Sequence, residues 1–339
     1  MSDQKKASLK KYNTFGIDVQ AREILSATSV EDVQRIIKEK DPSELFIIGG
    51  GSNMLLTQDI DKYVVHINIK GYTVVDMPFG ENELLLNVAG GENWHDFVCY
   101  CIDHGYGGVE NLSLIPGNVG TAPIQNIGAY GVELKDVFYQ CGAVSRKDGT
   151  LRTFSLEDCK FGYRDSVFKT ELKDQYIITS VTFKLTLKDH KIKTEYGAIS
   201  DTLAEQEITN PTIKEVSDAV IKIRQEKLPD PKKIGNSGSF FKNPVISQTV
   251  FSELRKNYPD IPYYPIGSDQ IKVPAGWLIE QAGFKGKRFG DAGVHDKQAL
   301  VLVNHGNATG SEIWALAVRI QDEVKEKFGI IISPEVNVF

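Results

Sequence analysis

The 339-residue chain has only four cysteines, and their spacing excludes two kinds of site. Cys99 and Cys101 lie two apart, while Cys141 and Cys159 stand alone, so the sequence offers neither a dense disulfide framework nor a C-x-x-C metal pair. The six histidines show no H-x-x-x-H spacing for a shared metal ion. We therefore predict buried, reduced thiols and no metal site.

The chain also lacks an excess of positive charge and a long hydrophobic run. Its formal net charge is -6 and its pI is near 5.6, which argues against nucleic acid or an anionic membrane as the main partner. The first sixteen residues contain four lysines with no apolar stretch behind them, unlike a secretory signal, and no later run approaches transmembrane length. We expect a cytoplasmic protein.

Two common nucleotide-binding signatures are missing. The chain has no G-x-x-x-x-G-K-[ST] loop. The segment GGGSN, residues 49–53, is not a G-x-G-x-x-G fingerprint, because the third glycine would fall on Met54. GGGSN follows a predicted helix with Ser29 as N-cap and a predicted strand at 45–48. Backbone N–H groups at such a strand end can bind an anion, although the segment alone is a weak signal.

The most informative segment is PGNVGTAPIQNIGAYG, residues 116–131, with four glycines and two prolines. A segment of this composition is expected to keep most backbone N–H groups out of helices and sheets, so they need other partners. A phosphate or a flavin is the obvious candidate, because long loops inside compact domains are usually functional. The alternative is an ordered structural loop, since Gly and Pro mark turns whatever the function.

The remaining chain mixes helical and strand-like patterns, which predicts an α+β fold of two or three domains. A helix at 212–227 ends in KLPDPK, where two prolines stop it, and we place a domain boundary there. Other predicted strands lie at 63–69, 84–88, 137–145, 176–187, 299–303 and in the terminal IISPEVNVF, and other predicted helices lie at 94–102, near 251, around 277 and at 312–328.

Six segments in order resemble the signature segments of the UDP-N-acetylenolpyruvoylglucosamine reductases, which are flavoenzymes of bacterial peptidoglycan synthesis. The resemblance extends from Asn13-Thr14-Phe15-Gly16 to Glu335. TEYGAIS, residues 194–200, resembles the form of the family in which a tyrosine loop closes over the substrate. The six segments are GGGSN, PGNVGTAPIQNIGAYG, FGYRDS (161–166), KLPDPK, GSFFKNP (238–244) and the terminal PE.

The resemblance implies a particular domain organisation. It predicts a two-part FAD-binding domain of the vanillyl-alcohol-oxidase type plus a smaller α+β substrate-binding domain. We place the first FAD-binding subdomain at 1–70, the second, with the loop 116–131, at 71–228, and the substrate-binding domain at 229–332. Whether the C-terminal strand, 333–339, returns to the first subdomain or to the site stays open.

The resemblance also implies a reaction. NADPH would pass a hydride to FAD, and UDP-N-acetylglucosamine enolpyruvate would then accept it at the β-carbon, with protonation of the α-carbon to follow. The cofactor would supply the hydride chemistry and the protein the orientation. The expected cofactors are FAD and NADPH, and the expected partner is this nucleotide sugar. A monomer is favoured, although no motif predicts the oligomeric state.

Three residues carry the chemistry in the family match. Ser239 would donate the proton, which is feasible because a carboxylate enolate is a very strong base. Arg164 would stabilise the growing charge on the substrate carboxylate. Glu335 would either polarise Arg164 or act as a protonated donor with a raised pKa. The alternative is structural: Ser239 as a turn or capping residue, and Arg164 in a salt bridge with Asp165 or with Glu335.

The match also assigns binding residues. Lys227 would face the diphosphate, although a lysine at a helix C-terminus is also favoured by the helix dipole alone. Glycines in the FAD loops would allow close approach of the pyrophosphate to the backbone. The expected substrate contacts are Tyr163, Tyr196, Lys227 and Asn243, and the expected FAD contacts are Gly49, Gly50, Gly51, Ser52, Asn53, Pro116, Gly117, Gly120, Thr121, Gln125, Asn126, Ile127 and Gly128.

Two other functions fit parts of the pattern. An FAD-dependent alcohol oxidase on the same scaffold would need a base near the flavin in place of a proton-donating Ser239. A non-catalytic flavin- or nucleotide-binding protein would keep the glycine loops, but would give Ser239, Arg164 and Glu335 no reason to occur together.

Overall fold

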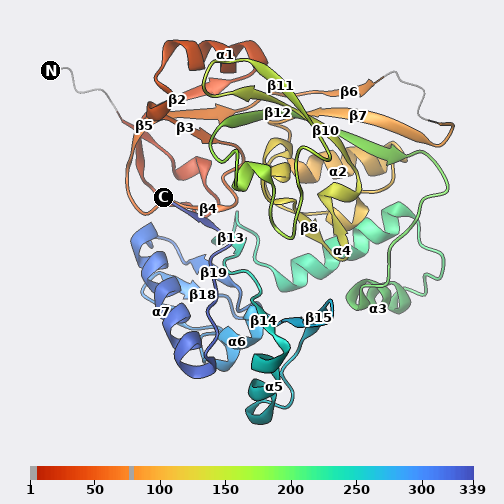
Figure 1. The fold of residues 1–339 in the computed structure, drawn as a ribbon, viewed down its shortest axis with the longest axis vertical. Helices are drawn as coiled ribbons and strands as arrows, with labels where there is room; N and C mark the ends of the chain where they lie inside the picture. Colours follow the sequence, from red (N-terminus) through yellow and green to blue (C-terminus); the bar gives the residue numbers. More distant parts are fainter. Residues whose placement is uncertain (1–5, 76–79) are drawn as a thin grey trace. The chain divides into compact units, whose positions relative to one another are not determined.

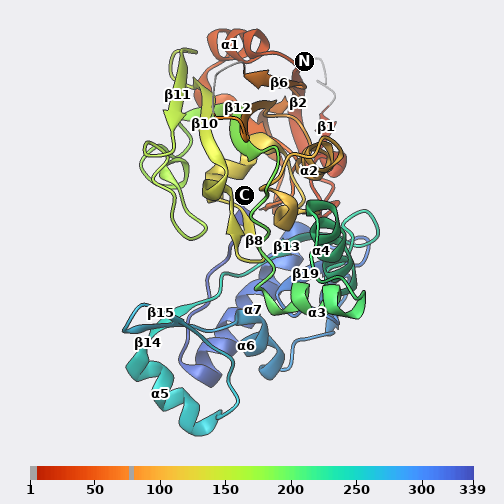
Figure 2. The same ribbon diagram turned by 90° about the vertical axis from the view of Figure 1, so that its right-hand side faces the viewer.

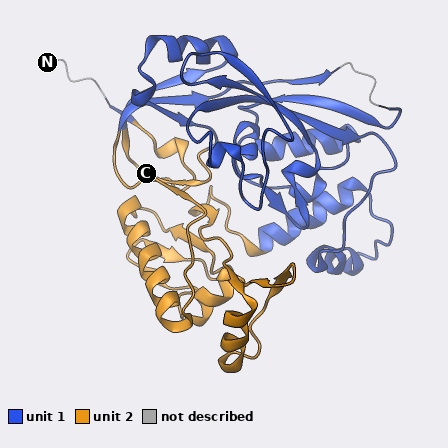
Figure 3. Ribbon diagram, viewed as in Figure 1, with its two compact units in different colours: residues 1–7, 21–50, 61–226 blue, residues 8–20, 51–60, 227–339 orange. Residues whose placement is uncertain are grey.

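The computed structural model describes residues 6–75 and 80–339, which form two compact units (Figure 3). Unit 1 comprises residues 1–7, 21–50 and 61–226, and unit 2 comprises 8–20, 51–60 and 227–339. Each unit is therefore built from separate stretches of chain. The division into three domains at 70, 228 and 332 stays a prediction, and its residues 1–5 and 76–79 lie outside the described ranges.

Unit 1 is built around a five-stranded antiparallel sheet in the order β11-β10-β12-β7-β6 (Figure 1). Three of its strands confirm the predictions made at 84–88, 137–145 and 176–187 to within about a residue at each end. The strands are β6 (Tyr72–Val75), β7 (Glu83–Ala89), β10 (Phe138–Ser145), β11 (Leu151–Ser155) and β12 (Tyr176–Thr186).

A second sheet and a helix cover one face of this sheet. The sheet has the order β1 (Ala7–Ser8), β2 (Gln20–Ala27), β5 (Ile60–Ile67), β3 (Leu45–Ile48), with β3 parallel to β5. Helix α1 (Val30–Glu39) begins at Ser29, whose hydroxyl accepts from the N–H of Asp32 at 3.0 Å, as predicted. Its buried residues pack with Val144 of β10 and Ile177 of β12 in one apolar cluster. Helix α1 is drawn above β2 in both views (Figures 1 and 2).

Helix α2 (Trp94–Asp103) and the glycine-rich segment cover the opposite face. Trp94, Phe97 and Phe183 are almost fully buried there and contact one another edge-on or stacked. The helix ends just before Gly105, which adopts φ +71° as the predicted helix stop requires. Helices α3 (Gly197–Glu205) and α4 (Ile213–Lys227) share a separate apolar cluster with Tyr130 at its edge.

Unit 2 has its own sheet, in the order β13-β19-β18-β17, with β13 (Gly235–Ser239), β19 (Val301–Asn304), β18 (Ala292–Val294) and β17 (Arg288–Phe289). Helix α7 (Gly310–Phe328) packs on β18 and β19 and contacts α6 (Ala275–Gln281). Thr309 and Glu312 form a capping box at the start of α7, and Gly329 ends it at φ +65°.

The smaller elements complete the two units. A three-stranded sheet, β14-β16-β15, is accompanied by α5. The bounds of these elements are β14 (Val245–Ser247), α5 (Gln248–Asn257), β15 (Tyr264–Ile266) and β16 (Gln270–Lys272). Two short strand pairs are formed by β4 (Met54–Leu55) with β20 (Asn337–Val338) and by β8 (Gly128–Ala129) with β9 (Val132–Glu133). Short 3-10 helices lie at Lys10–Tyr12, Pro42–Glu44, Glu110–Leu112, Val119–Gln125, Leu134–Asp136 and Val167–Lys169.

Several sequence predictions need correction. The predicted strand in IISPEVNVF is reduced to an antiparallel bridge between Pro334 and Phe241 and to residues 337–338, and Glu335 lies in a bend between these two pieces. Cys99 is exposed, whereas the other three thiols are buried as predicted. Among the helices of the described ranges, none has the length and apolar character needed to cross a bilayer.

Candidate active site

The two glycine segments of unit 1 lie against each other. A Cβ atom at Gly49 would lie 2.7 Å from Cγ2 of Thr121, and one at Gly50 would lie 2.8 Å from both Oδ1 of Asn118 and Cα of Gly117. Real Cβ atoms do not approach other heavy atoms so closely, so both positions require glycine. Residues 49–50 therefore pack directly on residues 117–121, and we call these two packed segments, which include predicted FAD contacts, the glycine surface.

The glycine-rich segment is more ordered than its sequence indicates. Residues 119–125 form a 3-10 helix, and the N–H groups of Val119 and Gly120 donate to the carbonyls of Glu92 and Gly90 at 2.8 and 2.9 Å. The N–H groups of Asn126 and Ile127 both donate to Ala122. The expectation that most backbone N–H groups of the segment lack protein partners is therefore wrong for these residues. Any contact of these residues with a ligand would use atoms other than the backbone N–H.

Asn126 connects the glycine-rich segment to FGYRDS. It is fully buried at φ +44°, a conformation that asparagine tolerates better than most residues. Its Nδ2 donates to the carbonyl of Gly162 at 2.9 Å and to Oε2 of Glu133 at 3.1 Å. Its Oδ1 accepts from the N–H of Lys135 at 3.1 Å. Asn126 thus fixes the turn that presents the next two residues.

Arg164 and Tyr163 sit in that tight turn, which Gly162 and Asp165 close with two backbone hydrogen bonds. Arg164 adopts φ +53°, which is uncommon for a residue other than glycine and concentrates at functional sites. Its guanidinium donates to the carbonyl of Gly128 at 2.6 Å and lies 5.9 Å from the ring of Tyr163. Tyr163 is 47% exposed, so its side chain is accessible to a ligand.

A second arginine, which the sequence analysis missed, reaches the same segment. Nε of Arg224 donates to the carbonyl of Leu114 at 3.3 Å, just before the segment begins. Tyr130 lies at its other end, at φ +48°, and its ring contacts that of Tyr196 edge-on at 5.3 Å between centroids. Burial raises the pKa of Tyr130, and the charge of Arg224 opposes this rise. The available signal was an arginine three residues before Lys227 in RQEKLPDP.

Ser239 occupies the end of β13 in unit 2. Its side chain is exposed, whereas the next two residues, Phe240 and Phe241, are buried. Gly238 at φ +68° and an irregular register between Asn236 and Ser239 turn the chain outward at this point. The N–H of Phe240 donates to the carbonyl of Leu300 at 2.7 Å, so the backbone that presents the hydroxyl is fixed.

Glu335 lies beside this strand end. Its N–H donates to the carbonyl of Phe240 at 2.8 Å. Nδ2 of Asn53 donates to the carbonyl of Glu335 at 3.5 Å, and the N–H of Asn337 donates to the carbonyl of Asn53 at 3.2 Å. Unit 2 therefore brings together Ser239, Glu335 and Asn53, which are far apart in the sequence.

Other predicted residues have structural contacts of their own. Oδ1 of Asn243 accepts from the N–H of Ala275 at 2.9 Å, at the start of α6. Lys227 is the exposed last residue of α4, where the helix dipole also favours it. Tyr196 is the half-exposed residue before α3. Gly51, at φ +60°, packs against the carbonyl of Tyr12 and is followed by Ser52 without regular structure.

The two units divide the predicted residues between them. Unit 1 holds Arg164, Tyr163 and Tyr196, together with Gly49, Gly50 and the segment 116–128, which includes Pro116 and Gln125. Unit 2 holds Ser239, Glu335, Lys227, Asn243 and residues 51–53. Within unit 2 the structure brings Ser239, Glu335 and Asn53 together, and within unit 1 it brings residues 49–50 onto residues 117–121, whereas the functional roles of all these residues stay predictions.

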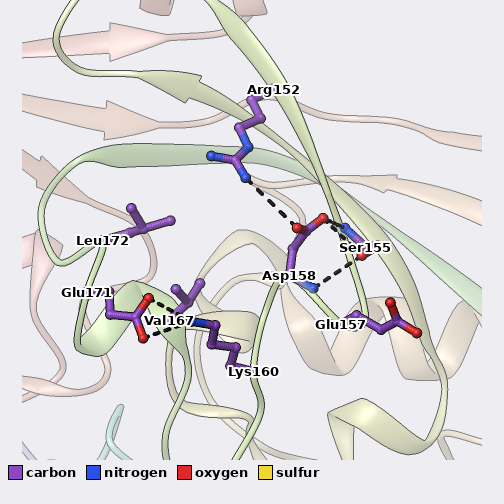
Figure 4. A pocket seen from close by; sticks show the side chains of 8 residues that line it. All are labelled: Arg152, Ser155, Glu157, Asp158, Lys160, Val167, Glu171 and Leu172. Atoms are coloured by element: carbon purple, nitrogen blue, oxygen red, sulfur yellow. Dashed lines mark hydrogen bonds and ion pairs between the residues drawn. The ribbon is translucent and has the colours of Figure 1, made fainter.

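A different hollow of unit 1, about 400 Å³ in volume, contains none of the predicted residues (Figure 4). Charged side chains line much of it: Lys160 pairs with Glu171 at 2.8 Å, and Arg152 lies 3.9 Å from Asp158. These are exposed ion pairs, which contribute little to stability or specificity. We assign it no function.

Comparison with known proteins finds the family that the sequence motifs resemble, and the similarity extends over the whole chain. Residues 21–155 match the model of an FAD binding domain, and residues 230–339 match that of the UDP-N-acetylenolpyruvoylglucosamine reductase C-terminal domain. The chain is 55% identical to the UDP-N-acetylenolpyruvoylglucosamine reductase of Flavobacterium johnsoniae, with 100% of both proteins covered. It is 47% identical to that of Pseudomonas aeruginosa, over 99% of this chain and 98% of the relative.

A solved structure supports the fold. The UDP-N-acetylenolpyruvylglucosamine reductase of Thermus caldophilus matches with a TM-score of 0.68 and 24% identity, covering 99% of this chain and 98% of that one. The predicted α+β fold with an FAD-binding part and a further C-terminal part is thus confirmed.

Proposed function

Because this chain belongs to the UDP-N-acetylenolpyruvoylglucosamine reductase family, we propose that it reduces UDP-N-acetylglucosamine enolpyruvate to UDP-N-acetylmuramate in peptidoglycan precursor synthesis. The observation that carries the proposal is 55% identity over the full length of both proteins. Membership of the family makes the chain an FAD-dependent oxidoreductase, and the predicted use of NADPH agrees with it. Action in the cytoplasm is part of the proposal.

The glycine surface of unit 1 fits FAD. Gly49 and Gly50 let residues 49–50 pack directly on residues 117–121, so the backbones of the two predicted FAD-binding segments lie together, where both could contact a pyrophosphate. The surface lies within the unit that contains most of the matched FAD-binding region. Bound FAD would supply the hydride chemistry between NADPH and the substrate. The backbone of 49–53 and 116–118, with Thr121, Gln125 and Gly128, would hold it.

Ser239 is the proposed proton donor to the α-carbon. Addition of hydride to the β-carbon leaves an enolate of a carboxylate, which is basic enough to take a proton from a hydroxyl held in line. The exposed hydroxyl on a fixed backbone suits this role, because it can reach a ligand without moving the strand. The hydrogen bonds that fix Phe240 act as the support for this geometry.

Arg164 and Glu335 are proposed to stabilise the negative charge that develops on the substrate carboxylate. The planar guanidinium of Arg164 can bind a carboxylate with two parallel hydrogen bonds and stabilise its growing charge. Glu335 would polarise that guanidinium, or would act as a protonated donor. Tyr163 and Tyr196 are accessible, half-exposed phenols that would contact the substrate, and Lys227 and Asn243 would contact its diphosphate and uridine.

An anaerobic absorbance titration tests the proposal. NADPH should bleach the oxidised flavin band of the purified protein, and UDP-N-acetylglucosamine enolpyruvate should then restore it. If a flavin is present but the sugar does not restore the band, the reductase proposal is wrong. Bleaching by simple alcohols in place of NADPH would favour an oxidase. A colourless protein that takes up no added FAD would exclude both.

A further inference from the structure

Asn111 is a buried asparagine whose amide binds two separate stretches of chain. It is 1% exposed and lies in the 3-10 helix Glu110–Leu112. Its Nδ2 donates to the carbonyl of Tyr130 at 3.1 Å and to the carbonyl of Lys193 at 2.9 Å, which uses both hydrogens of the amide. Its buried oxygen has no hydrogen-bond donor among the residues that the structure describes.

The helix that carries Asn111 is itself held by neighbouring elements. Nε1 of Trp94, on α2, donates to the carbonyl of Leu112 at 2.9 Å. The hydroxyls of Ser113 and Ser217 form a hydrogen bond at 2.8 Å, and Ser217 belongs to α4. All four of these residues are buried. Asn111 therefore projects from a fixed piece of backbone.

Lys193 lies in the connection between β12 and α3, residues 187–196, which has no helix or strand. Its side chain pairs with Asp136 at 3.4 Å, but this ion pair is exposed and contributes little. The buried hydrogen bond from Asn111 is the stronger of these two constraints. Tyr196 follows three residues later, and three residues span at most about 11 Å even when extended. A fixed Lys193 therefore limits where Tyr196 can lie.

Tyr130 restricts Tyr196 from another direction. The rings of the two tyrosines meet edge-on, with 5.3 Å between their centroids and 84° between their planes. The backbone of Tyr130 adopts φ +48°, and its carbonyl accepts the other hydrogen bond from Asn111. One amide thus fixes both the chain that leads to Tyr196 and the ring that Tyr196 contacts.

The hydrogen bonds of Asn111 serve position better than stability. A buried amide whose oxygen lacks a donor loses free energy relative to a fully satisfied one, whereas both of its donor bonds restrict the same side chain. We propose that Asn111 is a positioning residue for the reaction, which keeps Tyr196 at the substrate by holding Lys193 and Tyr130. The proposal rests on the proposed function in one respect, the contact of Tyr196 with the nucleotide sugar.

The test uses the FAD-loaded full chain with Asn111→Ala, which removes both hydrogen bonds, and with Asn111→Ser, which can keep one. Asn82→Ala is the matched control, because Oδ1 of Asn82 accepts from the N–H of Lys188 at 2.8 Å, near the other end of the same connection. Flavin content and near-ultraviolet circular dichroism show whether each variant is folded. Asn111→Ser decides the result if Asn111→Ala does not fold. If neither folds, Asn111 is structural and the proposal is wrong.

The first measurement is the rate of tryptic cleavage after Lys193, which needs no nucleotide sugar. The carbonyl that trypsin attacks there is the one that Asn111 holds, so this peptide bond should resist cleavage until the segment opens. We expect Asn111→Ala to raise the rate at least tenfold and Asn82→Ala to leave it within twofold. An unchanged rate in the folded Asn111 variant would overturn the proposal.

The second measurement is the dissociation constant of UDP-N-acetylglucosamine enolpyruvate, followed by its effect on the oxidised flavin spectrum, in a double-mutant cycle with Tyr196→Ala. Asn111→Ala alone should raise this constant at least tenfold. In the Tyr196→Ala background it should change the constant less than twofold, because the side chain that Asn111 positions is absent. Equal effects in the two backgrounds, or no effect of Asn111→Ala alone, would contradict the positioning role.

The two measurements keep the proposal distinct from the proposed function. If the unsubstituted protein binds no nucleotide sugar, the proposed function is wrong, and the positioning role is wrong with it. If the unsubstituted protein binds and reduces the sugar, failure of the cleavage result or of the cycle contradicts only the role of Asn111.

Discussion

The backbone N–H of Glu335 donates to the carbonyl of Phe240 at 2.8 Å, which places Glu335 beside Ser239 at the end of β13. The contact uses backbone atoms only and involves neither the hydroxyl of Ser239 nor the carboxyl group of Glu335. A short hydrogen bond between main chains also holds both residues in place whatever their side chains are. Substitution of either side chain should therefore change chemistry more than structure.

Replacement of Ser239 by alanine should lower turnover about 10²-fold to 10⁴-fold, the range for loss of a general acid. Reduction of the flavin by NADPH should continue, because that half-reaction needs no proton from Ser239. Stopped-flow absorbance separates the two half-reactions. Ser252→Ala, which removes an exposed hydroxyl bonded within α5, is the control. Equal slowing of both half-reactions would show that Ser239 is not the donor.

Replacement of Gly50 by alanine should weaken FAD binding. The new methyl group would meet Asn118 and the backbone of Gly117 at about 2.8 Å, so the two glycine segments would have to separate. Fluorescence quenching of added FAD by the apoprotein measures the affinity, and we expect at least a tenfold loss.

Gly197→Ala is the control for Gly50→Ala, because a Cβ atom there meets nothing within 4 Å and Gly197 is the first residue of α3. That control should leave FAD affinity unchanged and stabilise the fold by about 0.4–1 kcal/mol. Similar FAD affinity in both variants would contradict the proposed role of the glycine surface.

Replacement of Asn126 by alanine should destabilise the fold and disturb Arg164 together. The change removes three hydrogen bonds of a fully buried side chain and leaves the N–H of Lys135 without its acceptor. We expect the free energy of unfolding in urea to fall by about 2–4 kcal/mol. Asn257→Ala, at the exposed end of α5, should change it little. If the free energy of unfolding falls no more in Asn126→Ala than in Asn257→Ala, the hydrogen bonds of Asn126 do not hold this turn.

Acid should weaken the fold through His95. Burial lowers the pKa of this imidazole, and its Nδ1 accepts from the N–H of Leu114 at 3.0 Å, which requires the neutral ring. The folded protein binds this proton less readily than the unfolded chain. The contribution of His95 to stability is therefore complete above the unfolded pKa of about 6.5, and it is lost as the pH falls from that value through the lower pKa of the folded protein. Urea unfolding between pH 7.5 and 5.5 measures the slope.

His95→Gln should flatten that slope, whereas His104→Gln, at the exposed end of the same helix, should not. An unchanged slope in His95→Gln would assign the acid sensitivity to other groups.

Local signals in the sequence predicted the elements well. Ser29 and the apolar spacing after it define α1, and the proline pair after Lys227 defines the end of α4, because both depend on neighbouring residues alone. The close approach of Gly50 to Gly117 was not predictable, since it depends on packing between distant stretches of chain. Arg224 was missed for a similar reason, because an arginine on a helix with an apolar face is normally assigned to the solvent-exposed face.

The pairing of β4 with β20 has a consequence for how the chain folds. The N–H of Thr57 donates to the carbonyl of Phe339 at 2.7 Å, and the N–H of Phe339 donates to Leu55 at 2.9 Å. Residues 54–55 therefore obtain their strand partner from residues 337–338, and the hydrogen-bonded Thr57 and Phe339 are 282 residues apart. Contacts between such distant parts form slowly, because a long loop must close first. Completion of the fold around Asn53 is thus expected to be a late folding step, and a chain truncated before residue 337 would lack the strand partner of β4.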